Sequence, residues 1–177
     1  YQQYLAAGTG SEWGGEARGY WYPDLDMSKG DLTAWVHAGF TGKTVLALSG
    51  SVGFSPDELP PDAGFDLYYT EDRNVRSGYA IGELVATDYA LASVELRHDF
   101  LTFKVPPAFP CIVQGFAFCD VAMVDPVIGK KTDDALDAYG AGVRILIENP
   151  VFAYFTFTYG VNHEGDGRFI FCGTAGY

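Results

Sequence analysis

Cysteine, basic residues and long apolar runs are all scarce in this chain of 177 residues. The 3 cysteines, an odd number without close spacing, indicate neither a disulfide framework nor a zinc site. Lys and Arg total 11 against 23 Asp and Glu, and this net charge of −12 argues against nucleic acid as a partner, because phosphate binding needs clustered basic side chains. No run of about 18 apolar residues occurs, which excludes a membrane-spanning helix but not membrane-spanning strands.

Apolar and aromatic residues, by contrast, are abundant. Hydrophobic side chains make up 48% of the chain and aromatic side chains 16%, which excludes a disordered polyanion. The length suits a single domain over residues 1–177. Because Tyr1 is not an initiator Met and no leader-like segment follows it, we expect a mature product or a fragment.

Period-two alternation of apolar and polar residues runs through most of the chain, and helical periodicity is nearly absent. This pattern predicts an all-β, antiparallel protein with about eight strands. We expect the strands at residues 12–23, 31–41, 43–55, 88–103, 111–124, 138–149, 151–161 and 168–177. A further extended segment, 65–72, falls within a long loop that we expect over residues 56–87.

The two faces of these predicted strands differ in chemistry. In the segment 88–103, for example, Val94 and Leu96 alternate with Glu95 and Arg97. Of the six arginines, two fall in the long loop and the rest fall on the polar face, namely Arg18, Arg97, Arg144 and Arg168. An Arg that faces lipid at mid-bilayer costs about 2–4 kcal/mol, so this avoidance favours an antiparallel transmembrane β-barrel. The alternative is a soluble β-sandwich, whose strands also alternate.

Loop lengths and aromatic residues favour the barrel as well. Long or polar connections alternate with short ones, as in outer-membrane barrels, and this places the C-terminus on the periplasmic side. The long connections are 24–30, 56–87, 125–137 and 162–167. Large aromatics of the apolar face lie near predicted strand ends, as in an aromatic girdle, namely Tyr139, Phe155, Tyr159 and Tyr177.

A motif in the long loop carries a family resemblance. Its residues, just before the strand at 88–103, are Val75, Arg76, Ser77, Gly78 and Tyr79. This loop and strand resemble the sixth extracellular loop and following strand of the BamA-type bacterial surface antigens, in the outer membrane protein 85 superfamily, and Ser77 gives the motif the style of the patatin-linked members. Residues 115–122 are similar to the next family strand, and residues 138–177 to its last three strands, whose terminal aromatics form an assembly signal. The aromatics at the matching end of this chain are Phe169, Phe171 and Tyr177.

The resemblance implies a role for the loop arginine. In that family the loop folds back into the barrel lumen, and its Arg pairs with carboxylates of later strands. Carried over, Arg76 would pair with Asp120 and Glu95, which both fall on the polar face. Such a guanidinium makes bidentate, charge-assisted bonds. The alternative is an exposed loop arginine, because Ser77 shifts the turn by one position.

The number of strands raises a question of closure. The family barrel has sixteen strands, whereas about eight are predicted here, and an eight-stranded barrel is just filled by its own side chains. Either the loop stays outside a small barrel, or the sheet is not closed by one chain. In the second case two copies could pair edge to edge, a partner chain could supply the other half, or the chain could be the C-terminal half of a larger protein.

For function, the resemblance implies insertion or translocation of polypeptides in the bacterial outer membrane. A weakly paired seam between the first strand and the segment 168–177 would open and offer strand edges to a client polypeptide, and Gly173 and Gly176 would weaken pairing there. The alternatives are a small structural barrel that anchors an outer-membrane complex, and a pore or adhesin. Partners would include the lipid bilayer and its surface glycolipid. We predict no cofactor, metal site or catalytic residue, since His37, His98 and His163 lie on separate elements without a nucleophile motif.

Overall fold

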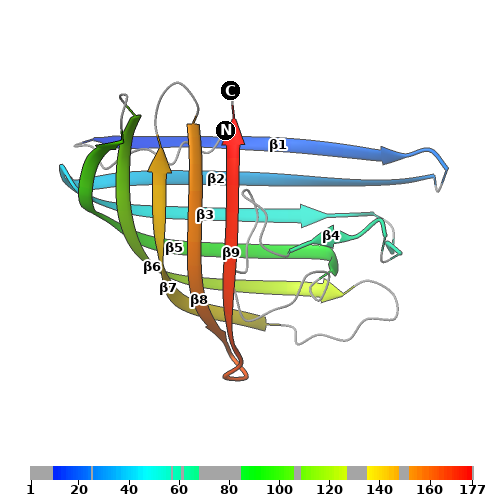
Figure 1. Ribbon diagram of the computed structural model, residues 1–177. Helices are drawn as coiled ribbons and strands as arrows, with labels where there is room; N and C mark the ends of the chain where they lie inside the picture. The colour runs from blue at the N-terminus through cyan, green and yellow to red at the C-terminus, as the bar shows by residue number, and fades with distance from the viewer. Residues whose placement is uncertain are drawn as a thin grey trace.

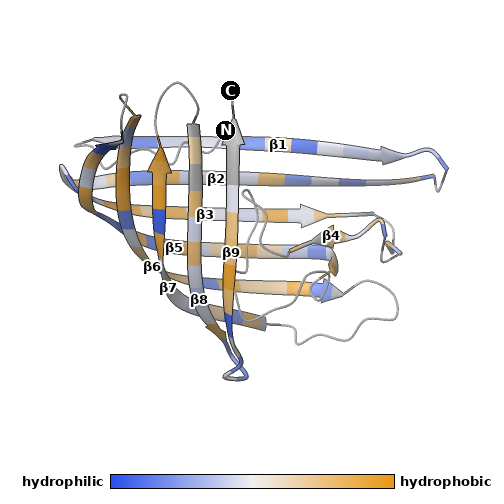
Figure 2. Ribbon diagram, viewed as in Figure 1, coloured by the Kyte–Doolittle hydropathy of each residue, from blue (hydrophilic) through white to orange (hydrophobic). Residues whose placement is uncertain are grey.

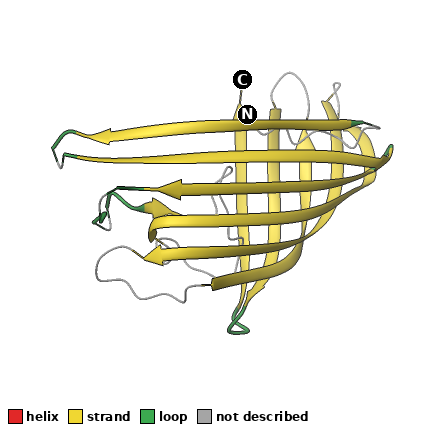
Figure 3. Cartoon of the chain, turned by 180° about the vertical axis from the view of Figure 1, so that it is seen from behind, coloured by secondary structure: helices red, strands yellow, loops and turns green. Residues whose placement is uncertain are grey.

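The computed structural model describes residues 10–24, 26–56, 58–60, 62–67, 85–105, 109–126, 135–147 and 152–176. Each element of these ranges is a strand (Figures 1 and 3). The strands are β1 (Ser11–Tyr22), β2 (Met27–Thr41), β3 (Thr44–Phe54), β4 (Phe65–Asp66), β5 (Val85–Val105), β6 (Phe109–Pro126), β7 (Ala135–Ile147), β8 (Phe152–Asn162) and β9 (Gly167–Gly176). Within the described part, no helix is long and apolar enough to cross a membrane.

The strands form one antiparallel sheet in the order β1-β2-β3-β5-β6-β7-β8-β9, and the short β4 pairs with β5. Strands that follow one another along this path are neighbours in the sheet, and β2 and β3, for example, are joined by the two-residue turn at Gly42 and Lys43. The prediction of an all-β, antiparallel protein of about eight strands is therefore confirmed.

Three strands begin three or four residues earlier than predicted. One of them, β7, begins at Ala135 rather than at residue 138, inside the connection predicted over residues 125–137. β2 begins at Met27 rather than at residue 31, because the β1–β2 ladder continues to the pair Tyr22–Met27. Residues 27–30 are part of this ladder although they do not show the alternation of apolar and polar residues. β5 begins at Val85, inside the loop predicted over residues 56–87. Of the extended segment predicted at 65–72, the structure describes residues 65–67, which include β4 at Phe65–Asp66.

The sheet curves strongly, so that β1–β3 and β7–β9 run in different directions in Figure 1. Its strands are also staggered. Trp13 of β1 and Gly167 at the start of β9 lie in the same row of cross-strand pairs, which runs across all the strands of the sheet. From this row β1 extends to Tyr22 in one direction, and β9 extends to Gly176 in the opposite direction. Such a stagger is what tilted strands of a barrel require. Among the described residues β1 and β9 do not pair, so the sheet is open with two edges.

Alternate residues of each strand lie on an inner and an outer face. On β5 the inner residues Glu95 and Arg97 are 1% and 5% exposed, whereas the outer residues Val94 and Leu96 are 44% and 49% exposed. The alternation in hydropathy along the strands is visible in Figure 2. The period-two pattern of the sequence therefore separates the two faces as predicted.

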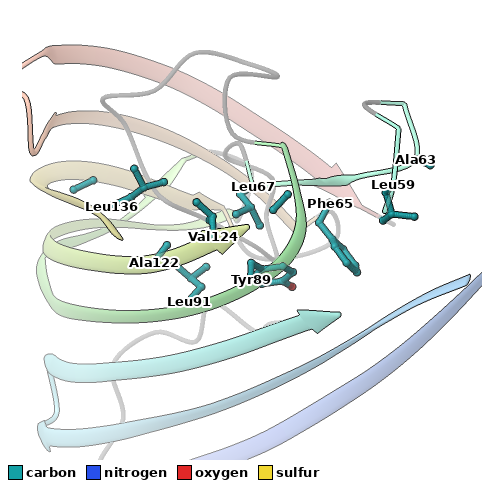
Figure 4. Packing of buried hydrophobic residues seen from close by; sticks show 11 residues of the cluster. Leu59, Ala63, Phe65, Leu67, Tyr89, Leu91, Ala122, Val124 and Leu136 are labelled. Atoms are coloured by element: carbon teal, nitrogen blue, oxygen red, sulfur yellow. The ribbon is translucent and has the colours of Figure 1, made fainter. Parts of the chain in front are cut away.

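An apolar cluster covers one end of the inner face (Figure 4). Leu59, Phe65 and Leu67, from the segment between β3 and β5, pack there against side chains of β5, β6 and β7, namely Tyr89, Leu91, Ala122, Val124, Leu136 and Ala138. Complete burial of a Leu or Phe contributes about 1.5–3 kcal/mol, which holds this segment on the sheet. Of the two positions considered for the long loop, its described residues thus occupy the inner one.

Candidate functional site

A cluster of charged and polar side chains lies on the inner face beside the apolar cluster. Its members come from β5, β6 and β7, and each is at most 7% exposed: Ser93, Glu95, Arg97, Asp99, Gln114, Asp120 and Arg144. We call this set the inner polar cluster. The residues of β5 reach one face because they are spaced by two in the sequence. Those of β6 and β7 join them through the register, which pairs Gln114 with Arg144.

Hydrogen bonds link the cluster across the three strands. Glu95 accepts hydrogen bonds from Arg97 Nε and, at 3.3 Å, from Arg144 Nη1. Arg144 Nη1 also donates to Gln114 Oε1 at 2.9 Å, and Gln114 Nε2 donates to Asp99 Oδ1 at 2.8 Å. Buried charges are tolerated only when they are paired in this way, and removing one partner of such a pair costs about 3–5 kcal/mol.

The two carboxylates that the sequence singled out lie in this cluster. Asp120 is fully buried on β6 and accepts a hydrogen bond from Ser93 Oγ across the β5–β6 ladder. Glu95 lies on the same face of the neighbouring strand, as the alternation predicted. Arg76, with the remaining motif residues Val75, Gly78 and Tyr79, lies outside the described residues. The pairing of Arg76 with Asp120 and Glu95 therefore stays a prediction.

The sequence reasoning did not assign the described partners of Glu95. It placed Arg97 and Arg144 on the polar face but paired neither with a carboxylate. The spacing of Glu95 and Arg97 by two residues was a local signal for one ion pair, which i,i+2 neighbours on one face of a strand can form. The contact of Arg144 with Glu95 depends on the register of β7 with β6, for which the sequence carries no local signal.

Two glycines of β7 make room for aromatic rings of β6 on the inner face. A Cβ atom added at Gly142 would lie 2.5 Å from Phe116 Cζ, and one added at Gly140 would lie 2.8 Å from Phe118 Cζ. The guanidinium carbon of Arg144 lies 4.6 Å from the centroid of the Phe116 ring, a cation–π contact. Gly142 therefore helps to position Arg144, because it leaves room for the Phe116 ring beside β7.

Lys29 anchors the loop segment to β2. Its Nζ donates hydrogen bonds to the carbonyl oxygens of Ala63 and Gly64, at 2.7 and 2.8 Å. The same atom lies 4.6 Å from the ring centroid of Phe65 and 5.4 Å from that of Tyr22. Contacts of a cation with two carbonyl oxygens and aromatic rings are directional, so they hold the segment 62–67 against β2 in one orientation. The sequence analysis did not find it, because it joins residues that are far apart in the chain.

The outer face is apolar from β1 to β9. Exposed large apolar residues on it include Trp13, Leu32, Val52, Leu96, Val121, Val143, Phe157, Phe169 and Phe171. All four arginines of the described strands have the opposite parity, as predicted. The carboxylates of the outer parity lie next to long connections, namely Asp88, Asp125 and Asp137. The predicted terminal aromatics Phe169 and Phe171 are 85% and 61% exposed here, and Tyr177 lies outside the described residues.

Comparison of the chain with protein-family models, with curated proteins and with solved structures finds no match. The resemblance to the BamA-type surface antigens therefore stays a prediction from the sequence motifs. A proposal about function then depends on what the geometry offers: an apolar outer face, a buried inner polar cluster and two open sheet edges.

Proposed function

We propose that the chain is a β-barrel component of the bacterial outer membrane that takes part in the insertion or transport of polypeptides. The membrane location is supported by the distribution of side chains between the two faces of the sheet. The outer face is apolar, and all the arginines of the described strands have the inner parity. The polypeptide part depends on the open edges of the sheet together with the resemblance of the loop motif.

Hydrocarbon suits the outer face better than water does. Soluble monomers rarely expose apolar patches larger than about 300–600 Å². Here neighbouring exposed residues continue across all the main strands, for example Leu48 on β3, Val94 on β5 and Tyr139 on β7. These strands have 10–21 residues, and a tilted strand needs about 9–11 residues to cross a membrane.

The open edges suit a protein that handles strands of other polypeptides. An unpaired edge has free N–H and C=O groups to which an extended chain can add by β-augmentation. Glycines lie along both edge strands, including Gly15 and Gly19 on β1 and Gly173 on β9, and glycine weakens strand pairing. A seam at these strands would therefore open more readily than the ladders between inner strands.

A structural barrel that anchors a complex is the second candidate, and the filled inner face favours it over a pore. Glu95 and Asp120 are 1% and 0% exposed, and Leu59 and Leu67 of the loop segment are fully buried on the same face. A water-filled channel needs hydrated lumen side chains. We therefore expect little ion conductance.

Depletion of the protein from its bacterial host tests the proposal. We expect the tagged protein to fractionate with the outer membrane, and depletion to lower the amounts of other outer-membrane proteins while inner-membrane proteins stay unchanged. Loss of a single complex only would favour the anchor. Recovery of the protein in the soluble fraction would contradict the membrane part, and high conductance in liposomes would favour a pore.

A further inference from the structure

We infer that a second copy of this chain completes the barrel, with β1 of each copy paired antiparallel to β9 of the other; this inference rests on the proposed membrane barrel. The two-fold axis would run along the barrel, and the two seams would be identical. A hydrocarbon environment does not tolerate the two edges that one copy leaves open, so some closure is required.

Strand direction permits this closure. The main path of the sheet has eight strands, and every neighbouring pair is antiparallel. Because eight is even, β1 and β9 run in opposite directions. Joining β9 of one copy to β1 of the next therefore continues the antiparallel alternation through both seams, and the outer face stays apolar all round.

The contents of the inner face argue against closure of one copy on itself. An eight-stranded barrel has an interior that the side chains of its own strands just fill. Here the inner face also holds Leu59, Phe65 and Leu67 from the loop segment, all at most 1% exposed. Two of the strand side chains on this face, Phe116 and Phe118, are also large and buried. A wider ring of strands accommodates this content.

The outer residues of the two edge strands are complementary in size. Between Trp13 and Trp21, the outer face of β1 has only Gly15, Ala17 and Gly19. The outer face of β9 has Phe169 and Phe171. Trp13 and Phe169 are 82% and 85% exposed, because each lies on a strand that has a neighbour on one side only. Large aromatics pack well over glycine and alanine of a facing strand.

One register satisfies both faces. With Trp21 opposite Gly167, the aromatics Phe169 and Phe171 face Gly19 and Ala17, and all 10 residues of β9 find partners on β1. On the inner face Tyr20 then lies opposite Arg168, and Glu16 lies opposite Cys172. Shifting β9 by two residues toward the start of β1 would place Arg18 opposite Arg168, and like charges directly opposite each other are destabilising. The opposite shift would place Phe169 opposite Trp21 instead of a glycine.

The native Cys172 makes the seam testable by disulfide formation. We would replace Cys111 and Cys119 with Ala, keep Cys172, and introduce Glu16→Cys in membranes that hold two differently tagged copies. Oxidation should shift this variant from the mass of one chain to the mass of two, and each tag should capture the other. The matched control is Gly15→Cys, whose thiol would lie on the outer face and out of reach of Cys172.

Other outcomes would overturn the inference. A disulfide within one chain would mean that the sheet closes on itself, and a product of any other mass would mean that a different chain occupies the edge. If Glu16→Cys stays monomeric while the protein is in the outer-membrane fraction, the second copy is wrong and the membrane proposal survives. If the protein is soluble without detergent, both fail.

Discussion

The inner and outer faces of β5 differ in both chemistry and exposure. Glu95 and Leu96 are adjacent in the sequence, yet the carboxylate is 1% exposed and the leucine 49%. In a protein dissolved in water, the charged residue would lie outside and the leucine inside. The comparison supports the proposal that the apolar face of this sheet lies against an apolar environment, and it shows that the charges find their partners on the inner face.

The largest expected effect comes from removing a charge of the inner face. Arg144→Ala takes away a hydrogen-bond partner of both Glu95 and Gln114, so we expect a loss of about 3–5 kcal/mol in the free energy of unfolding, measured by denaturant titration in detergent or lipid. Arg168→Ala, on an exposed arginine of the edge strand β9, is the control and should cost at most about 1 kcal/mol. Equal losses for the two variants would mean that the inner polar cluster contributes no more to the free energy of unfolding than an exposed arginine does.

A charge on the outer face should have the next largest effect. Leu96→Arg places a guanidinium against hydrocarbon near the middle of β5, and we expect a loss of about 2–4 kcal/mol in lipid vesicles. Leu96→Met keeps the apolar character and should cost less than about 1.5 kcal/mol. If Leu96→Arg is as stable as Leu96→Met, the outer face is in contact with water.

Removing the contacts of Lys29 should destabilise the loop segment locally. Lys29→Met removes the hydrogen bonds that a single ammonium group donates to the carbonyls of Ala63 and Gly64, and we expect this to destabilise the segment locally by about 1.5–3 kcal/mol. We expect faster amide hydrogen exchange in residues 62–67 and unchanged exchange in β8. The control is Lys43→Met, at the two-residue turn between β2 and β3. Unchanged exchange in residues 62–67 would show that the apolar cluster alone holds the segment.

The smallest effect should come from a methyl group on the inner face. Gly142→Ala brings a Cβ atom to 2.5 Å from both Phe116 Cζ and the backbone oxygen of Phe157, and should cost about 1–3 kcal/mol through overpacking. Gly50→Ala is the matched control on the outer face, since its nearest atom, Leu91 O, would lie at 3.6 Å, an ordinary contact. Unfolding titrations of both variants compare the faces directly. A Gly142→Ala protein as stable as the Gly50→Ala protein would argue against close packing of Phe116 on β7.

Much of the fold could be predicted from the sequence because it follows from local alternation. The segments that became β3 and β6 and the face on which Glu95 and Asp120 lie needed only a period of two. The beginning of β2 at Met27 could not be predicted in this way, since pairing with β1 extends the strand past the apolar pattern.

The site was less predictable because it depends on contacts between distant residues. Arg144 reaches Glu95 through the register of three strands, and Lys29 meets Ala63 only after the loop segment has folded onto the sheet. Neither contact leaves a local mark in the sequence. The motif around Arg76 did leave one, and its pairing is a separate prediction that mutation of Arg76 can test.

Quenching of tryptophan fluorescence by brominated lipid tests the central claim most directly. Trp13 lies on the outer face and is 82% exposed, whereas Trp35 lies on the inner face against Gly14. Variants that keep only one of these tryptophans, with Phe at the other two positions, would be reconstituted in vesicles with and without brominated acyl chains. The proposed barrel predicts strong quenching for the protein that keeps Trp13 and little for the protein that keeps Trp35. Equal quenching of the two, or none of Trp13, would contradict an outer face in contact with lipid.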